Sequence, residues 1–269
     1  MNLIDKVFAE LQAKKETALI PFLTMGDPDK ETTIDIIKEA EAAGAHIIEL
    51  GVPYSDPLAD GPVIQRASQR ALIYNITLDD CMEIAQSARQ QGVKLPFVLF
   101  TYFNPVLQYG VERLIEKAKE MDISGLLIPD LPIEENAVIR KLTEKHGIHL
   151  ISLIAPTSAD RIAKIASEAA GFIYCVSSLG VTGERADFHH EIDQFLSTVR
   201  KHANVPIAVG FGISSREQVE RFEPLCDGVI IGSAIVRTIE ENIPLLQSNE
   251  QRATGLNNIR QFIAQFKPE

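Results

Sequence analysis

The residues best suited to chemistry gather in one segment, residues 49–62, which reads Glu-Leu-Gly-Val-Pro-Tyr-Ser-Asp-Pro-Leu-Ala-Asp-Gly-Pro. Glu49 stands near the C-terminal end of an apolar run, where burial disfavours a carboxylate anion and raises its pKa. Such a group suits general acid–base catalysis. The alternative for Glu49 is a structural glutamate that is hydrogen-bonded within the core. Asp60 follows in a Pro/Gly-rich loop, and taken alone it is explained by an ordinary Asp-Gly turn.

Glycine-containing segments suggest a phosphate site. Gly210-Phe211-Gly212 and Gly232-Ser233-Ala234 each follow an apolar run near the end of the chain. Glycines let backbone N–H groups approach an anion, and a helix N-terminus adds to the attraction. One such segment is a weak signal, whereas two at consecutive strand ends are typical of a phosphate-ester site. A further segment, residues 179–183, resembles a lid whose glycine could add another amide.

Other reaction classes find little support in the sequence. No lysine falls inside a predicted strand, which disfavours a Schiff-base aldolase. The chain has neither an HxH nor an HExxH pattern, and its three cysteines are scattered, so we expect no metal site and no disulfide framework. No Gly-rich dinucleotide fingerprint follows the first apolar run. We therefore expect a reaction that uses no cofactor.

The composition narrows the class of protein. Lys and Arg number 26 and Asp and Glu 37, which gives a net charge of −11 and disfavours a nucleic-acid binder. Apolar residues make up 45% of the chain, enough for a large core. The longest apolar-rich stretch, residues 95–111, is short and broken by prolines, and the N-terminus lacks the apolar core of a signal peptide. We expect a cytoplasmic protein with no membrane segment.

Short apolar runs alternate with amphipathic stretches along the whole chain. The runs are apolar on both faces, as buried parallel strands are. Thr77-x-x-Asp80 and Ser214-x-x-Glu217 look like helix-opening capping boxes. The predicted strands cover residues 19–25, 46–51, 95–101, 124–128, 149–154, 172–177, 206–210 and 228–231.

Eight strands in 269 residues match the count and length of a (β/α)8 TIM barrel, which would form one domain over residues 1–269. An open, doubly wound sheet is the main alternative. In a barrel, the residues at the C-terminal ends of the strands become the candidates for the active site.

The segments above resemble those of the tryptophan synthase alpha chain family. The pattern of residues 49–62 is similar to the family signature, and the supporting matches run from the first predicted strand to the last. They are residues 21–28, 127–132, 180–183, 210–213 and 232–234. The resemblance implies a (β/α)8 barrel with an extra N-terminal helix, here residues 3–14. One departure is Ser178-Leu179, where some relatives carry an arginine in the lid.

The resemblance also implies a carbon–carbon lyase, in which retro-aldol cleavage of indole-3-glycerol phosphate gives indole and glyceraldehyde 3-phosphate. On the matching positions, Glu49 and Asp60 are the catalytic carboxylates. Glu49 would transfer protons, and anionic Asp60 would accept the ring N–H. The substrate-binding residues implied are Phe22, Phe100, Leu127 and Tyr174 around the indole, and Thr182, Gly183, Gly212, Gly232 and Ser233 around the phosphate.

The family resemblance further implies a partner. A pyridoxal-phosphate beta chain would take up the indole to make L-tryptophan, within an alpha2beta2 heterotetramer. We expect Tyr54, Asp56 and Asp130 at the interface, since their loops rise beside Glu49, although all three residue types also occur in solvated turns. Two other functions stay open: a barrel that mainly binds and activates a partner, and a stand-alone lyase that releases indole.

Overall fold

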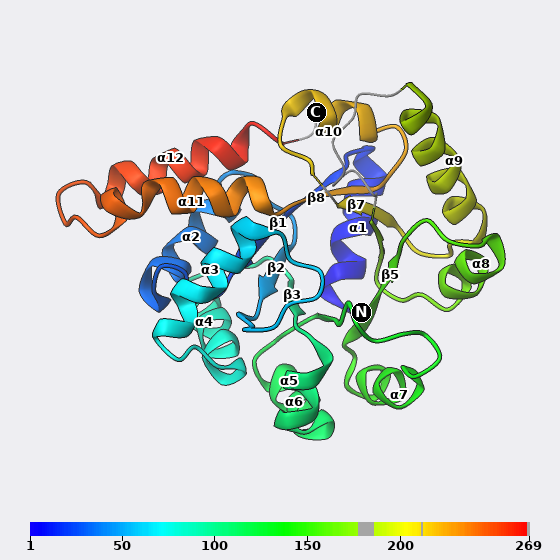
Figure 1. The fold of residues 1–269 in the computed structure, drawn as a ribbon, viewed down its shortest axis with the longest axis horizontal. Helices are drawn as coiled ribbons and strands as arrows, with labels where there is room; N and C mark the ends of the chain where they lie inside the picture. The colour runs from blue at the N-terminus through cyan, green and yellow to red at the C-terminus, as the bar shows by residue number, and fades with distance from the viewer. Residues whose placement is uncertain (177–185, 211, 268–269) are drawn as a thin grey trace.

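Eight parallel strands close into a barrel in chain order, with β8 pairing back onto β1 (Figure 1). The computed structural model describes residues 1–176, 186–210 and 212–267. It confirms the (β/α)8 TIM barrel and excludes the open sheet. The strands are β1 Ala18–Thr24, β2 Ile48–Gly51, β3 Phe97–Phe100, β4 Gly125–Leu127, β5 His149–Ile154, β6 Ile173–Val176, β7 Ile207–Gly210 and β8 Gly228–Ile231.

Helices form a ring around the strands (Figure 1). The first, α1, covers Leu3–Lys14, the range expected for the extra N-terminal helix. Ile4, Phe8 and Leu11 of this helix pack into the inner core of the barrel. The other helices are α2 Lys30–Ala42, α3 Pro62–Ile73, α4 Leu78–Gln90, α5 Phe103–Tyr109, α6 Val111–Glu120, α7 Ala137–His146, α8 Ala159–Ser167, α9 Ala186–His202, α10 Arg216–Phe222, α11 Ser233–Leu246 and α12 Arg252–Ala264.

The strands bury both of their faces, because one faces the barrel interior and the other faces the helices. Leu19, for example, belongs to the outer core, whereas its neighbour Ile20 belongs to the inner core. Side chains alternate with a period of two along a strand. This alternation turns Phe22 and Glu49, which are partners in the register of β1 and β2, toward the interior near the C-terminal ends of their strands.

Helix caps confirm one predicted start and correct another. Thr77 and Asp80 form the expected capping box of α4. At α10 the box is Ser215 with Gln218, one residue later than predicted, so Ser214 and Glu217 do not form it. The reason is that the Gln218 amide oxygen reaches both backbone N–H groups before the helix, those of Ser214 and Ser215.

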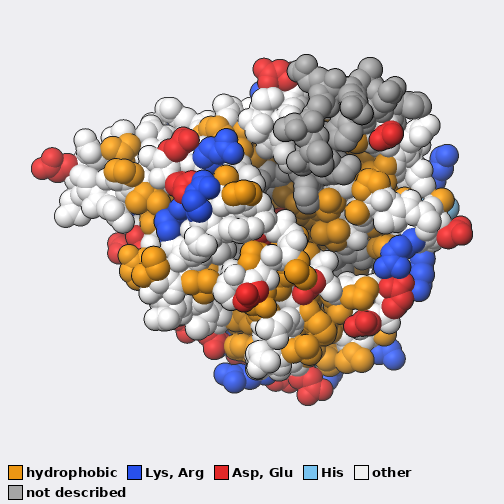
Figure 2. Space-filling model, viewed as in Figure 1, with side chains coloured by type: hydrophobic (Ala, Val, Ile, Leu, Met, Phe, Trp, Pro, Cys, Tyr) orange, Lys and Arg blue, Asp and Glu red, His pale blue; other side chains and the backbone are white. Residues whose placement is uncertain are grey.

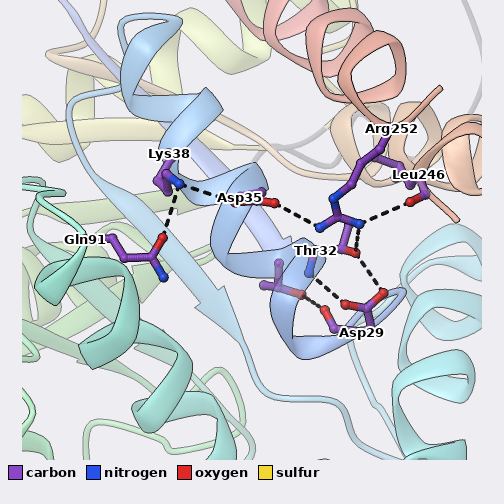
Figure 3. A network of polar contacts seen from close by, with 8 residues as sticks. Asp29, Thr32, Asp35, Lys38, Gln91, Leu246 and Arg252 are labelled. Carbon is purple, nitrogen blue, oxygen red and sulfur yellow. Dashed lines mark hydrogen bonds and ion pairs between the residues drawn. The ribbon is translucent and has the colours of Figure 1, made fainter. Parts of the chain in front are cut away.

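Arg252 of the last helix, α12, bonds to the second helix, α2 (Figure 3). The Arg252 guanidinium of α12 donates to Thr32 Oγ1 at 3.0 Å and to Asp35 Oδ2 at 2.9 Å, both on α2. It also donates to the Leu246 carbonyl at the end of α11, at 3.1 Å. This side chain therefore joins three helices on one side of the barrel. No helix in the described ranges is long and apolar enough to cross a membrane.

Arg252→Ala removes all three contacts of this arginine and should lower the free energy of unfolding by about 1–3 kcal/mol. Arg260→Ala is the matched control on the same helix, because its ion pair with Glu39 spans 3.7 Å and its side chain is largely exposed. Such a surface pair contributes about 0–1 kcal/mol. Urea unfolding of both variants measures the difference. An equal effect of the two substitutions would contradict the role given to Arg252.

Candidate active site

A cavity of about 580 Å³ opens among the loops that follow the C-terminal ends of the strands. Figure 2 shows hydrophobic side chains around the hollow near the middle of this face. The cavity is within the size range of small-molecule sites. Its lining residues are Phe22, Leu58, Ala59, Asp60, Gly61, Ile64, Phe100, Pro129, Leu153, Tyr174, Gly212, Ile213, Ser214, Ile230, Gly232, Ser233, Ala234 and Arg237.

Glu49 is a fully buried carboxyl group with no hydrogen-bond partner among the described residues. It projects from β2, its exposed fraction is 0%, and neither oxygen bonds to a described residue. Burial raises its pKa to about 8, because an unpaired anion is strongly disfavoured there. No described residue supplies the hydrogen bond that the alternative of a structural glutamate requires. Its register partner Phe22 lines the cavity, so Glu49 lies at the level of the cavity floor, protonated near neutral pH.

Asp60 lines the same cavity from the loop between β2 and α3. Burial raises the pKa of its carboxyl group, and a hydrogen bond with the Tyr102 hydroxyl opposes that rise. The same hydroxyl accepts a hydrogen bond from the Ala59 backbone N–H at 3.0 Å, and the Asp60 carbonyl accepts one from Gln65 Nε2 at 2.7 Å. The environment of Asp60 is therefore more polar and more exposed than that of Glu49. The hydrogen bonds at Ala59 and at the Asp60 carbonyl hold its loop in place.

The opposite wall carries the predicted phosphate residues. Gly232 precedes α11 and Ser233 begins it, and no side chain caps this helix N-terminus. The first N–H groups of α11 are therefore available to an anion. Gly212, on the loop after β7, adopts the left-handed φ of +65°, which favours glycine. Thr182 and Gly183 lie outside the described residues.

Aromatic rings supply the apolar part of the cavity. Phe22 and Phe100 meet edge to face with ring centroids 5.5 Å apart, and Tyr174 lies nearby in the lining. The pKa of Tyr174 is raised by burial and by the charges of Glu49 and Asp60. Both carboxyl groups therefore affect the ionisation of the same tyrosine hydroxyl. Leu127 does not line the cavity, contrary to expectation. It is fully buried in the inner core, in the cluster that also contains Tyr174, and Pro129 of the following loop lines the cavity.

The three residues expected at a partner interface lie on the loops of this face. Tyr54 stacks on Tyr102 with ring centroids 5.1 Å apart, and its hydroxyl accepts a hydrogen bond from Asn104. Asp130 accepts one from the Phe103 backbone N–H at 2.9 Å. Asp56 is exposed and bonds to its neighbour Ser55. Tyr54 and Asp130 thus both support the start of α5.

Sequence reasoning missed Arg237, which lines the cavity from α11. It also missed the contact of Tyr102 with the loop of Asp60, since their separation of 42 positions leaves no local signal. The signal that could have identified Arg237 is its position four residues after Ser233, on the same face of a predicted helix.

In the described part of the chain, no three His, Cys, Asp or Glu side chains are arranged to hold a metal ion.

The family model of the tryptophan synthase alpha chain matches residues 8–266. The tryptophan synthase alpha chain of Halalkalibacterium halodurans is 49% identical over 252 residues, covering 94% of this chain and 95% of that relative. That of Geobacillus sp. strain WCH70 is 53% identical over 243 residues, covering 90% and 92%.

The fold agrees with these relatives. The crystal structure of tryptophan synthase subunit alpha from Legionella pneumophila str. Paris superposes with a TM-score of 0.86 at 35% identity, covering 98% of both chains. The match extends from α1 to α12 and includes Glu49, Asp60 and the loops that follow β7 and β8. The chain belongs to the tryptophan synthase alpha chain family.

Proposed function

We propose that Glu49 and Asp60 carry out the carbon–carbon cleavage of this family. As a tryptophan synthase alpha chain, the protein is a lyase that cleaves indole-3-glycerol phosphate in tryptophan biosynthesis. The observation that carries the assignment is the pair of environments: Glu49 is fully buried without a partner, and Asp60 lines the cavity beside a hydroxyl. Two carboxyl groups with separated settings can take separate roles at one pH.

Glu49 transfers the protons. Near neutral pH its raised pKa leaves a proton on the carboxyl group, which it donates to C3 of the indole ring. The resulting carboxylate then removes the proton from the side-chain hydroxyl next to that carbon. The hydroxyl oxygen becomes the aldehyde oxygen, the carbon–carbon bond breaks, and its electron pair returns to the ring. Glu49 ends the cycle protonated, as it began.

Asp60 stabilises the charge that this step creates. Protonation at C3 places positive charge on the ring nitrogen, and an anionic carboxylate accepts that N–H and lowers the energy of the charged state. The hydrogen bond from Tyr102 favours the anionic form of Asp60, which this role needs. The mechanism therefore uses Asp60 as the anion and Glu49 as the neutral acid before the reaction.

The rest of the cavity holds the two ends of the substrate. The indole ring lies among Phe22, Phe100 and Tyr174, and the phosphate lies against the backbone N–H groups of Gly212, Gly232 and Ser233. Thr182 and Gly183 complete the phosphate site on the family pattern. The cavity lining combines aromatic side chains with glycine and helix N-terminal amides, as a ligand that is apolar at one end and anionic at the other requires.

The family implies a beta-chain partner. We further propose that the protein works in the cytoplasm, as part of an alpha2beta2 heterotetramer. In this assembly the chain forms one domain and passes indole to the beta chain. Tyr54, Asp56 and Asp130 stand on the loops around the cavity, so a partner docked there would bear on the loop of Asp60. Binding would shift that loop toward its competent position.

The carboxylates are tested by Glu49→Gln and Asp60→Asn. Glu49→Gln keeps the shape and removes proton transfer, so kcat should fall at least about 100-fold. Asp60→Asn should also lower kcat strongly, because a neutral amide cannot balance the positive charge on the ring nitrogen. Indole release from indole-3-glycerol phosphate is the measurement. Glu112→Gln, an exposed carboxylate on α6, is the control and should change nothing. Near-normal rates in both active-site variants would refute the mechanism.

The pKa of Glu49 also predicts how stability depends on pH. It rises from 4.5 to about 8 on folding, so the native state holds a proton that the unfolded chain releases. The stability contributed by this group is full below pH 4.5 and is lost as pH rises through about 8. In between, the folding equilibrium constant should fall by up to about tenfold per pH unit.

Glu49→Gln abolishes that dependence, and other ionisable groups are common to both proteins. The difference in free energy of unfolding between Glu49→Gln and the wild type should therefore grow in favour of the variant from pH 5 to pH 8. Denaturant unfolding of the ligand-free chain at several pH values measures it. A difference that stays constant with pH would mean that Glu49 ionises normally in the folded protein.

The beta chain should stimulate indole formation more than about tenfold, equivalent to about 1.4 kcal/mol of barrier. Asp56→Ala should reduce this stimulation more than it reduces the activity of the isolated chain. The experiment is a titration of beta chain into alpha chain while indole release is followed. A flat titration, with full activity already present in the isolated chain, would favour the stand-alone lyase.

A further inference from the structure

Arg237 is a positive charge on the wall of the cavity. Of the cavity-lining residues that the structure describes, Asp60 carries the one negative charge and Arg237 the one positive charge. The Arg237 side chain is exposed, so it is free to adjust to a ligand. It belongs to α11, the helix whose uncapped N-terminus faces the same cavity.

The geometry of a helix directs this side chain toward that N-terminus. Arg237 stands four residues after Ser233, so the two share one face of α11. Side chains on a helix lean toward its N-terminal end, over the preceding turn. A guanidinium at this position can therefore reach over the turn that presents the first N–H groups of the helix. Arg237, Gly232 and Ser233 all line the same cavity.

Two carboxylates follow Arg237 on α11, Glu240 and Glu241, and neither forms an ion pair with it. Glu240 lies three residues further along α11, but Arg66 holds both of its oxygens, at 2.9 and 2.7 Å, and Arg70 holds Oε1 at 2.5 Å. Arg237 forms no hydrogen bond or ion pair with any residue in the described ranges. Its charge is therefore available to an anion in the cavity.

We infer that Arg237 binds the phosphate group of the substrate together with the N-terminal amides of α11. This inference rests on the proposed function, which places a phosphate ester against Gly232 and Ser233. A guanidinium matches a phosphate through two parallel hydrogen bonds, which are stronger when both groups are charged. The role also has an electrostatic reason, because the chain carries a net charge of −11 and would otherwise repel a dianion.

Arg237→Gln tests this role, with Arg237→Lys as the conservative variant and Arg260→Gln on α12 as the control of equal charge change. Arg237→Gln should raise KM for indole-3-glycerol phosphate about tenfold and leave kcat within about twofold, because the phosphate is bound equally before and during the reaction. Arg237→Lys should restore most of the affinity. Added salt should raise the KM of the wild type more than that of Arg237→Gln, since screening weakens only an existing charge contact.

A binding measurement on the ligand-free chain separates this inference from the proposed reaction. Calorimetric titration with glycerol 3-phosphate should show about tenfold weaker binding for Arg237→Gln, whereas the affinity for phosphate-free indole should stay unchanged. Equal loss for both ligands, or glycerol 3-phosphate binding within twofold of the wild type, would overturn the role of Arg237. A wild type that binds glycerol 3-phosphate but releases no indole would instead refute the proposed reaction and leave the binding role standing.

Discussion

The site depends on one constraint, the burial of a carboxyl group for which no described residue supplies a hydrogen bond. Glu49 lies inside a closed ring of strands among apolar side chains, and its pKa rises to about 8 for that reason alone. A hydrogen-bonding partner would lower the pKa and remove the proton that the reaction uses. The barrel must therefore stay closed, packed and dry around β2. The inner core and α1, which supplies Ile4, Phe8 and Leu11 to it, serve this purpose.

The two ends of the cavity are supported by one network of charges. Asp27, on the loop after β1, is 3% exposed and holds Arg70 of α3 through two hydrogen bonds of 2.8 and 2.9 Å. Arg70 and Arg66 both reach Glu240 of α11. Since α3 begins two residues after Asp60 and α11 begins at Ser233, the network joins the helix behind the catalytic loop to the helix behind the phosphate wall.

Most of the fold follows from local patterns. The eight strands and the capping box at Thr77 were predictable, because period, burial on both faces and capping residues act over a few positions. The N-terminal helix was expected from the family resemblance. The box at Ser215 was misplaced by one residue, since Ser214 and Ser215 are equally suitable and only the reach of the Gln218 side chain decides between them. Leu127 was expected around the indole from the family resemblance, whereas it is buried in the inner core and is not among the cavity-lining residues, because the lining depends on how side chains from several strands pack.

The sequence alone determined the barrel, the position of Glu49 on a strand and the glycines at the ends of β7 and β8. It identified Asp60 only through the family pattern, since a turn aspartate has no distinctive local signal. Tertiary structure decided that no described residue bonds to Glu49 and that Tyr102 supports the loop of Asp60. It also decided that two arginines engage Glu240, whereas Arg237 pairs with none of the described residues. The physical reason is that desolvation and charge pairing depend on which distant segments the closed barrel brings together.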